Sequence, residues 1–85
     1  MRFLNKVVFI TGAARGIGKS FATAFAKEGC RVVIADLNID QANSTAQEIG
    51  PNALALEMDV TKQESIDQAV NTAVDQLGGI DILIH

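Results

Sequence analysis

The sequence is poor in several kinds of residue, and each scarcity excludes a class of protein. Cys30 is the only cysteine among 85 residues, so an internal disulfide and a metal cluster built on thiolates are both excluded. Seven Lys and Arg stand against ten Asp and Glu, a formal net charge of −3. This balance argues against binding to the phosphate backbone of nucleic acids or to an anionic membrane. We expect no nucleic acid, membrane or metal as a partner.

Long apolar runs are also missing. The amino-terminal stretch MRFLNKVVFITG has no small-residue cleavage site after a long apolar segment, so neither a membrane span nor a signal peptide is predicted. We therefore expect a cytoplasmic protein. A content of 48% hydrophobic and 20% charged residues is typical of a folded chain. The length predicts a single small domain over residues 1–85, or a piece of a larger protein.

The sequence does contain a regular alternation of strand and helix patterns. Short β-branched runs at 6–11 and 31–36 are typical of parallel strands that are buried on both faces. Apolar alternation predicts a third strand over 54–58, and the run IDILI predicts a fourth over 80–84. The connections between these strands are short, and each contains one helical pattern. The order predicts an α/β fold with a parallel sheet and right-handed crossovers, half of a doubly wound Rossmann-type fold.

The three helical patterns end at glycines. From Ile17 apolar residues recur with helical spacing, for example at Phe21 and Ala24, until Gly29. The second pattern runs from Ile39 to Ile49 and ends at a Gly-Pro pair. The third has one apolar stripe that closes at two glycines, and Thr61 with Glu64 predicts a capping box at its start.

The stretch ITGAARGIGKS places three glycines where the first strand turns into the first helix. A helix that starts directly after a strand leaves backbone N–H groups without partners, and its dipole adds about half a positive charge there. Glycines allow a diphosphate to reach those groups. We assign Gly12 to the turn, Gly16 to close approach of the diphosphate and Gly18 to packing of the helix against the sheet. A tight turn with an incidental glycine is the alternative.

Asp36 ends the second strand, 20 positions after Gly16, where a ribose-binding acid is expected in Rossmann folds. Its carboxylate can accept hydrogen bonds from ribose hydroxyls and would repel a 2′-phosphate, which favours NAD over NADP. Arg15 weakens this preference for NAD, because its guanidinium can pair with a phosphate, either the diphosphate or the 2′-phosphate of NADP. Taken alone, Asp36 can also be a turn acid and Arg15 a solvent-exposed side chain.

These residues resemble a known family. TGAARGIG at 11–18 is similar to the T-G-x-x-x-G-x-G motif of the short-chain dehydrogenase/reductase family, MDV at 58–60 to its Asp-Val pair, and DILI at 81–84 to its fourth strand. Residues 34–50 resemble, more loosely, the NAD-dependent bacterial sorbitol and galactitol dehydrogenases. The resemblance implies that Asp59 and Val60 contact the adenine ring. The residues expected to bind the cofactor are Gly12, Arg15, Gly16, Ile17, Gly18, Asp36, Leu37, Asp59 and Val60.

The resemblance also implies hydride transfer between NAD and an alcohol or carbonyl, with catalytic Ser, Tyr and Lys residues. This chain contains no tyrosine, so no catalytic residue is assigned and the chain alone is expected to be inactive. His85 stands where the family usually has the first Asn of N-N-A-G. The small-molecule substrate, which resemblance suggests is a polyol, would be bound by residues of the full-length protein.

The family's strand order, third-second-first-fourth, places two helices on one face of the sheet and one on the other. Much of the second face is then expected to be bare, and the fourth strand to be an unpaired edge, so we expect self-association into a homo-oligomer. Three functional hypotheses remain open at this point. The chain is the NAD-binding part of an oxidoreductase, a nucleotide-binding module without catalysis, or an assembly module without a ligand.

Overall fold

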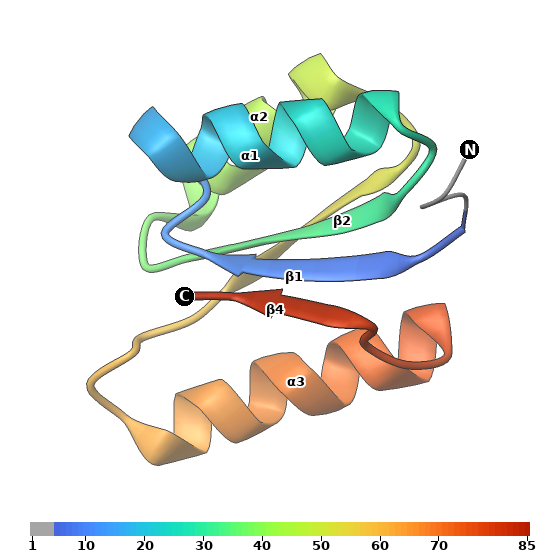
Figure 1. Ribbon diagram of the computed structural model, residues 1–85. Coiled ribbons are helices and arrows are strands. Elements are labelled where there is room, and N and C mark those ends of the chain that lie inside the picture. Colours follow the sequence, from blue (N-terminus) through green and yellow to red (C-terminus); the bar gives the residue numbers. More distant parts are fainter. Residues whose placement is uncertain (1–4) are drawn as a thin grey trace.

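The computed structural model describes residues 5–85, which form a four-stranded parallel sheet with helices on both faces (Figure 1). The strand order is β3-β2-β1-β4, which confirms the predicted α/β fold and strand order. Within the described residues no helix is long and apolar enough to cross a membrane. The elements in chain order are β1 Val7–Thr11, α1 Gly16–Lys27, β2 Arg31–Asp36, α2 Ile39–Ile49, β3 Ala53–Glu57, α3 Gln63–Leu77 and β4 Ile82–Ile84.

The two central strands divide the core into two layers. Side chains alternate along β1, so Val8 and Ile10 pack with α1 and α2, whereas Val7 and Phe9 pack with α3. Figure 1 shows α1 and α2 on one side of the sheet and α3 on the other. Because β1 and β2 are buried on both faces, their sequences are continuous apolar runs.

The apolar residues of α1 divide between two sides of the helix. Ala22 is fully buried and Phe25 packs against the core. Ile17 is 77% exposed and Phe21 is 45% exposed. These two residues are four positions apart and therefore lie on the same side of α1. Only part of the predicted apolar pattern thus belongs to the core of this chain.

The predicted capping box at the start of α3 is wrong. The N-cap residue is Lys62 rather than Thr61, and no side chain caps the helix. The Thr61 hydroxyl instead donates to Asp59 Oδ1 at 2.6 Å. An ionised carboxylate is a stronger acceptor than the alternatives within reach, so Thr61 turns toward Asp59 and leaves the helix N-terminus.

The face under α3 is better covered than the helix count suggests. Phe9 is 1% exposed, and it lies in one buried cluster with Ala69 and Ala73 of α3. Small side chains at these helix positions allow α3 to pack closely on the central strands. Leu83 of β4 is 63% exposed. The expectation of a largely bare second face is therefore wrong over β1 and β2 and correct at Leu83.

Candidate functional site

The nine residues predicted to bind a cofactor all lie near the end of the sheet where the parallel strands have their carboxyl ends. The glycine-containing turn leads from β1 into α1, Asp36 and Leu37 stand at the end of β2, and Asp59 and Val60 follow β3. In Figure 1 this end of the sheet is on the left, next to the first turn of α1. Because strand order fixes the neighbours, β2 lies between the turn and the residues after β3.

The glycines of the turn have separate structural reasons. Gly12 and Gly16 both have φ of +63°, a conformation that residues with a Cβ rarely adopt. A Cβ at Gly18 would lie 2.5 Å from the Gly12 carbonyl oxygen and 2.8 Å from Ala13 Cα. Gly18 was assigned to packing of the helix against the sheet, and the neighbours that a Cβ there would meet are the backbone atoms of the turn itself. The turn is tied to β2, since Gly12 N–H donates to the Ala35 carbonyl at 2.8 Å.

Among residues 5–85, no side-chain hydrogen bond caps the N-terminus of α1. Arg15 is the exposed N-cap residue, its side chain makes no capping hydrogen bond, and the first turn of α1 has no acidic residue. In α2, by contrast, Asn38 Oδ1 accepts a hydrogen bond from Gln41 N–H at 3.1 Å, and Asp40 lies in the first turn. The N–H groups at the start of α1 are therefore open to an anion from outside the chain.

The Asp36 carboxylate connects the end of β2 to this turn. Its Oδ2 accepts a hydrogen bond from Ala14 N–H and its Oδ1 one from Asn38 N–H, both at 3.1 Å. Each carboxylate oxygen can accept more than one hydrogen bond, so Asp36 can still receive a sugar hydroxyl. The sequence predicted a ligand-binding acid here, but not that the same side chain holds the turn.

The Asp59 carboxylate is fixed by residues that follow it. Its Oδ1 accepts hydrogen bonds from Thr61 N–H at 2.9 Å and from the Thr61 hydroxyl at 2.6 Å. These bonds, with a smaller contribution from the Lys62 charge, lower the pKa of Asp59 below its ordinary value of 3.8. The backbone N–H of Asp59 donates to Ser65 Oγ at 2.8 Å. Asp59 is thus an oriented anion at neutral pH.

Sequence reasoning missed Ser65 and Thr45, which hold the site, and gave Thr61 a different role. Thr61 and Ser65 orient Asp59, and the Asp itself is the sequence signal, because an Asp side chain commonly accepts a hydrogen bond from the backbone two residues later in an Asx turn. Thr45 of α2 is 2% exposed and donates its hydroxyl to the Ala14 carbonyl. No sequence signal pointed to Thr45, because its partner lies 31 positions away.

Large apolar side chains are exposed at the same end of the sheet. Ile17 is 77% exposed, Leu37 64% and Val60 51%. Such side chains at a turn provide a surface on which a flat ring can lie. Beside Val60 a small apolar cavity of about 100 Å³ extends between Phe9, Leu83 and α3. His85 Nδ1 lies 3.0 Å from the Thr11 hydroxyl and so is also at this end of the sheet.

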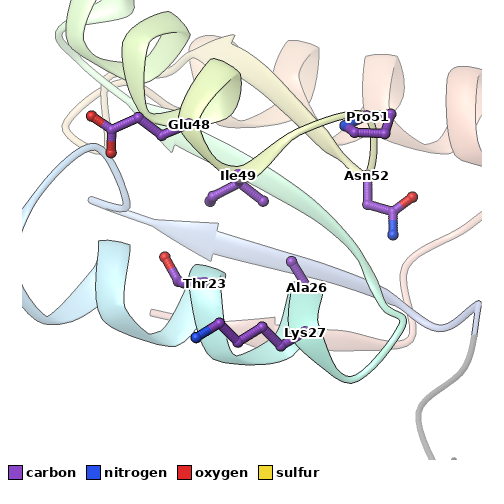
Figure 2. A pocket seen from close by; sticks show the side chains of 7 residues that line it. All are labelled: Thr23, Ala26, Lys27, Glu48, Ile49, Pro51 and Asn52. Atoms are coloured by element: carbon purple, nitrogen blue, oxygen red, sulfur yellow. The ribbon is translucent and has the colours of Figure 1, made fainter.

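A separate cavity lies at the opposite end of the sheet, where α1 and α2 finish (Figure 2). Its volume is about 390 Å³, and Lys27 and Glu48 are its charged lining residues. A Lys19–Glu48 ion pair of 2.7 Å joins the two helices nearby. None of the nine predicted residues lines this cavity. It belongs to the packing of two helices and is separate from the site at the carboxyl ends of the strands.

Comparison with known proteins links this arrangement to dehydrogenases. Sorbitol dehydrogenase from Cereibacter sphaeroides and galactitol 2-dehydrogenase from Agrobacterium fabrum are each 53% identical over 85 residues, all of this chain and 33% of each relative. A crystal structure of 3-ketoacyl-(acyl-carrier-protein) reductase from Brucella melitensis complexed with NADH matches with a TM-score of 0.92 at 44% identity. That match covers 94% of this chain and 33% of the reductase.

The chain therefore spans about a third of the length of the curated relatives that it matches. The two polyol dehydrogenases confirm the resemblance seen in residues 34–50. The family model described as short chain dehydrogenase matches residues 6–85, which is nearly the whole sequence. Together with the strand order and the glycine turn before α1, this match shows that the chain belongs to the short-chain dehydrogenase/reductase family.

Proposed function

We propose that this chain is the NAD-binding part of an oxidoreductase that transfers a hydride between NAD and an alcohol or carbonyl substrate. The observation that carries the proposal is the uncapped N-terminus of α1 beside the Asp36 carboxylate, which is hydrogen-bonded to the same turn. A diphosphate needs the first feature and a ribose with free hydroxyls needs the second. One ligand that carries both groups is a nicotinamide dinucleotide.

The residues present fit such a ligand. The open N–H groups of the first turn of α1 would receive the diphosphate, Asp36 the adenosine ribose, and the surface around Asp59 and Val60 the adenine ring. Gly16 has open space at its Cβ position, so the backbone can be approached closely there. The bound nicotinamide would supply the hydride donor or acceptor. The assigned binding residues remain Gly12, Arg15, Gly16, Ile17, Gly18, Asp36, Leu37, Asp59 and Val60.

The preference for NAD over NADP is part of the proposal. The Asp36 carboxylate would lie next to the ribose, where a 2′-phosphate would place a second negative charge against it. Arg15 lies exposed at the N-cap of α1 and can attract a phosphate. The position of Asp36, held by two backbone N–H groups, favours NAD because this carboxylate cannot easily turn away.

The substrate and the assembly belong to the protein that carries this chain. The names of the two relatives that are 53% identical suggest a polyol. The chain has no tyrosine, so we propose that the catalytic Ser, Tyr and Lys lie outside it and that residues 1–85 alone are inactive. We also propose one domain over these residues, a homo-oligomer and a cytoplasmic location, all supported by the composition and the family.

A nucleotide-binding module without catalysis is the second candidate, favoured by the same lack of tyrosine. The intact mass of the protein in its source organism separates the two candidates. A mass well above the 9.0 kDa of this chain supports the oxidoreductase. A product of 9.0 kDa supports the module, because such a chain has no tyrosine to act as the acid and base.

The cofactor preference is tested with Asp36→Asn in the intact protein. We expect NAD to bind about tenfold more weakly, because one charged hydrogen-bond acceptor is lost. NADP should bind at least as well as before, because the repulsion is removed. Isothermal titration calorimetry with both nucleotides measures the two affinities. Asp40→Asn removes the same charge in the first turn of α2 and serves as the control; a wild type that binds NADP more tightly than NAD contradicts the proposal.

A further inference from the structure

We propose that Thr45 is a positioning residue for the cofactor diphosphate. Its hydroxyl holds the Ala14 carbonyl and thereby directs the Arg15 N–H outward at the N-terminus of α1. Thr45 is outside the nine residues assigned above and does not itself touch the site. The inference rests on the proposed NAD binding and adds the residue that orients one of the N–H groups offered to the diphosphate.

The burial of Thr45 points to a specific task. Among residues 5–85 it is the one polar side chain in the buried core, at 2% exposure. Burial of a hydroxyl is unfavourable unless the group makes a hydrogen bond. Thr45 Oγ1 donates to the Ala14 carbonyl over 2.6 Å, and Ala14 is itself 2% exposed. A valine has the same shape and would bury equally well, so packing alone does not account for a threonine here.

Both backbone polar groups of Ala14, its N–H and its carbonyl, make hydrogen bonds to side chains. Its N–H donates to Asp36 Oδ2 at the end of β2, and its carbonyl accepts from Thr45 in α2. Asp36 Oδ1 also accepts from the N–H of Asn38, the N-cap residue of α2. The turn is therefore fixed to the end of β2 through Asp36 and to α2 through Thr45. A hydrogen-bonded network of this kind restricts the conformations of each member.

The direction of the next N–H follows from peptide geometry. The described chain has no cis peptide, and in a planar trans peptide the N–H points opposite to the carbonyl. Because the Ala14 carbonyl points toward Thr45 in α2, the N–H of Arg15 points away from α2. Arg15 is the N-cap residue of α1, with extended backbone angles. Its N–H therefore joins the open N–H groups at the start of α1, where an anion is favoured.

The variants Thr45→Val and Thr45→Ser separate the hydroxyl from the packing. In Thr45→Val the Ala14 peptide loses its fixed direction, so we expect NAD to bind about tenfold more weakly, the loss of one hydrogen bond to a charged group. Thr45→Ser keeps the hydroxyl and should bind NAD within about twofold of the wild type. Thr23→Val is the matched control, because the Thr23 hydroxyl also donates to a backbone carbonyl, that of Lys19.

Two measurements on the intact protein distinguish positioning from stability. Calorimetric titration with NAD gives the affinity at a temperature well below unfolding. The ¹H–¹⁵N spectrum without ligand reports the Arg15 N–H, which should shift in Thr45→Val and stay in place in Thr23→Val and Thr45→Ser. A lower melting temperature for Thr45→Val with an unchanged affinity and an unchanged Arg15 signal overturns the inference.

If Thr45→Val does not fold, Thr45→Cys replaces it, because cysteine is close to threonine in volume but its thiol is a weaker donor than a hydroxyl. An affinity equal to that of Thr45→Ser then contradicts the inference, and a weaker one supports it. Absence of NAD binding by the wild type overturns the proposed function and this inference together. Equal binding by wild type and Thr45→Val overturns this inference alone.

Discussion

Asp59 shows how a single residue of the site is prepared by its neighbours. The hydroxyl and the N–H of Thr61 both donate to one of its oxygens, and they lower its pKa. Removal of the hydroxyl in Thr61→Val should raise the pKa of Asp59 toward its ordinary value. A ¹³C titration of the Asp59 carboxyl by NMR measures the change. Thr72→Val removes an exposed hydroxyl that donates to Gln68 and should leave the Asp59 titration in place.

The same bonds make stability depend on pH in a defined direction. The folded pKa of Asp59 is lowered, so the folded state binds fewer protons than the unfolded chain below about pH 4. The contribution of Thr61 to folding is therefore fully present at neutral pH and is lost as the pH falls through the folded pKa. Equal acid sensitivity of wild type and Thr61→Val in urea unfolding would contradict this account.

The sequence was informative about residues whose task is local and silent about those whose task is distant. Gly18 and Asp36 were predicted because the turn and the strand end that require them are adjacent in the chain. Thr45 was not predicted, because a threonine inside a helical pattern gives no sign of a carbonyl 31 positions earlier. Thr61 was noticed but assigned to the wrong partner, since a capping serine or threonine and an Asx turn have similar patterns.

At the scale of elements, the position of α1 depends on Gly18. Glycine to alanine in a helix interior normally stabilises by about 1 kcal/mol. A Cβ at Gly18 would lie 2.5 Å from the Gly12 carbonyl, closer than atoms can approach. We therefore expect Gly18→Ala to destabilise the fold by about 3 kcal/mol, because α1 must move away from the turn. Chemical denaturation measures the change. An increase in stability would show that α1 does not pack here.

The boundaries of the elements were predictable where local chemistry decides them. The prediction for α2 matches the observed Ile39–Ile49, because Asn38 caps its start and a Gly-Pro pair follows its end. The prediction for β4 began two residues too early, because the strand begins at Ile82, although Asp81 already exchanges hydrogen bonds with Val7. The exposure of Ile17 and Phe21 on α1 was not predictable, because an apolar pattern does not show which side of a helix packs against the rest of the chain.

At the scale of the whole molecule, the apolar surface of β4 predicts association of the isolated chain. Leu83 is 63% exposed on the α3 side of the sheet, and among the described residues β4 pairs only with β1. An unpaired parallel edge with an apolar side chain favours contact with a second copy. We expect residues 1–85 to self-associate at micromolar concentration, as measured by sedimentation velocity.

Substitution of one side chain tests this expectation. Leu83→Lys should raise the dissociation constant of the assembly at least about tenfold, because it places a charge on the apolar surface. Val74→Lys on α3 is the control, since Val74 is also exposed, at 41%, but lies on a helix rather than on the edge. A monomer at every concentration with cooperative melting would contradict the prediction.

The polarity of the parallel sheet has a practical consequence. The turn before α1, Asp36 and Asp59 follow the carboxyl ends of β1, β2 and β3, whereas the cavity in Figure 2, with Pro51 and Asn52, lies at the other end. The loop before β3 is exposed and far along the strands from every residue that would touch a nucleotide. A surface linker attached at Asn52 would therefore leave the proposed nucleotide-binding end of the sheet unobstructed. One end of the sheet thus provides an attachment point, and the other carries the proposed binding site.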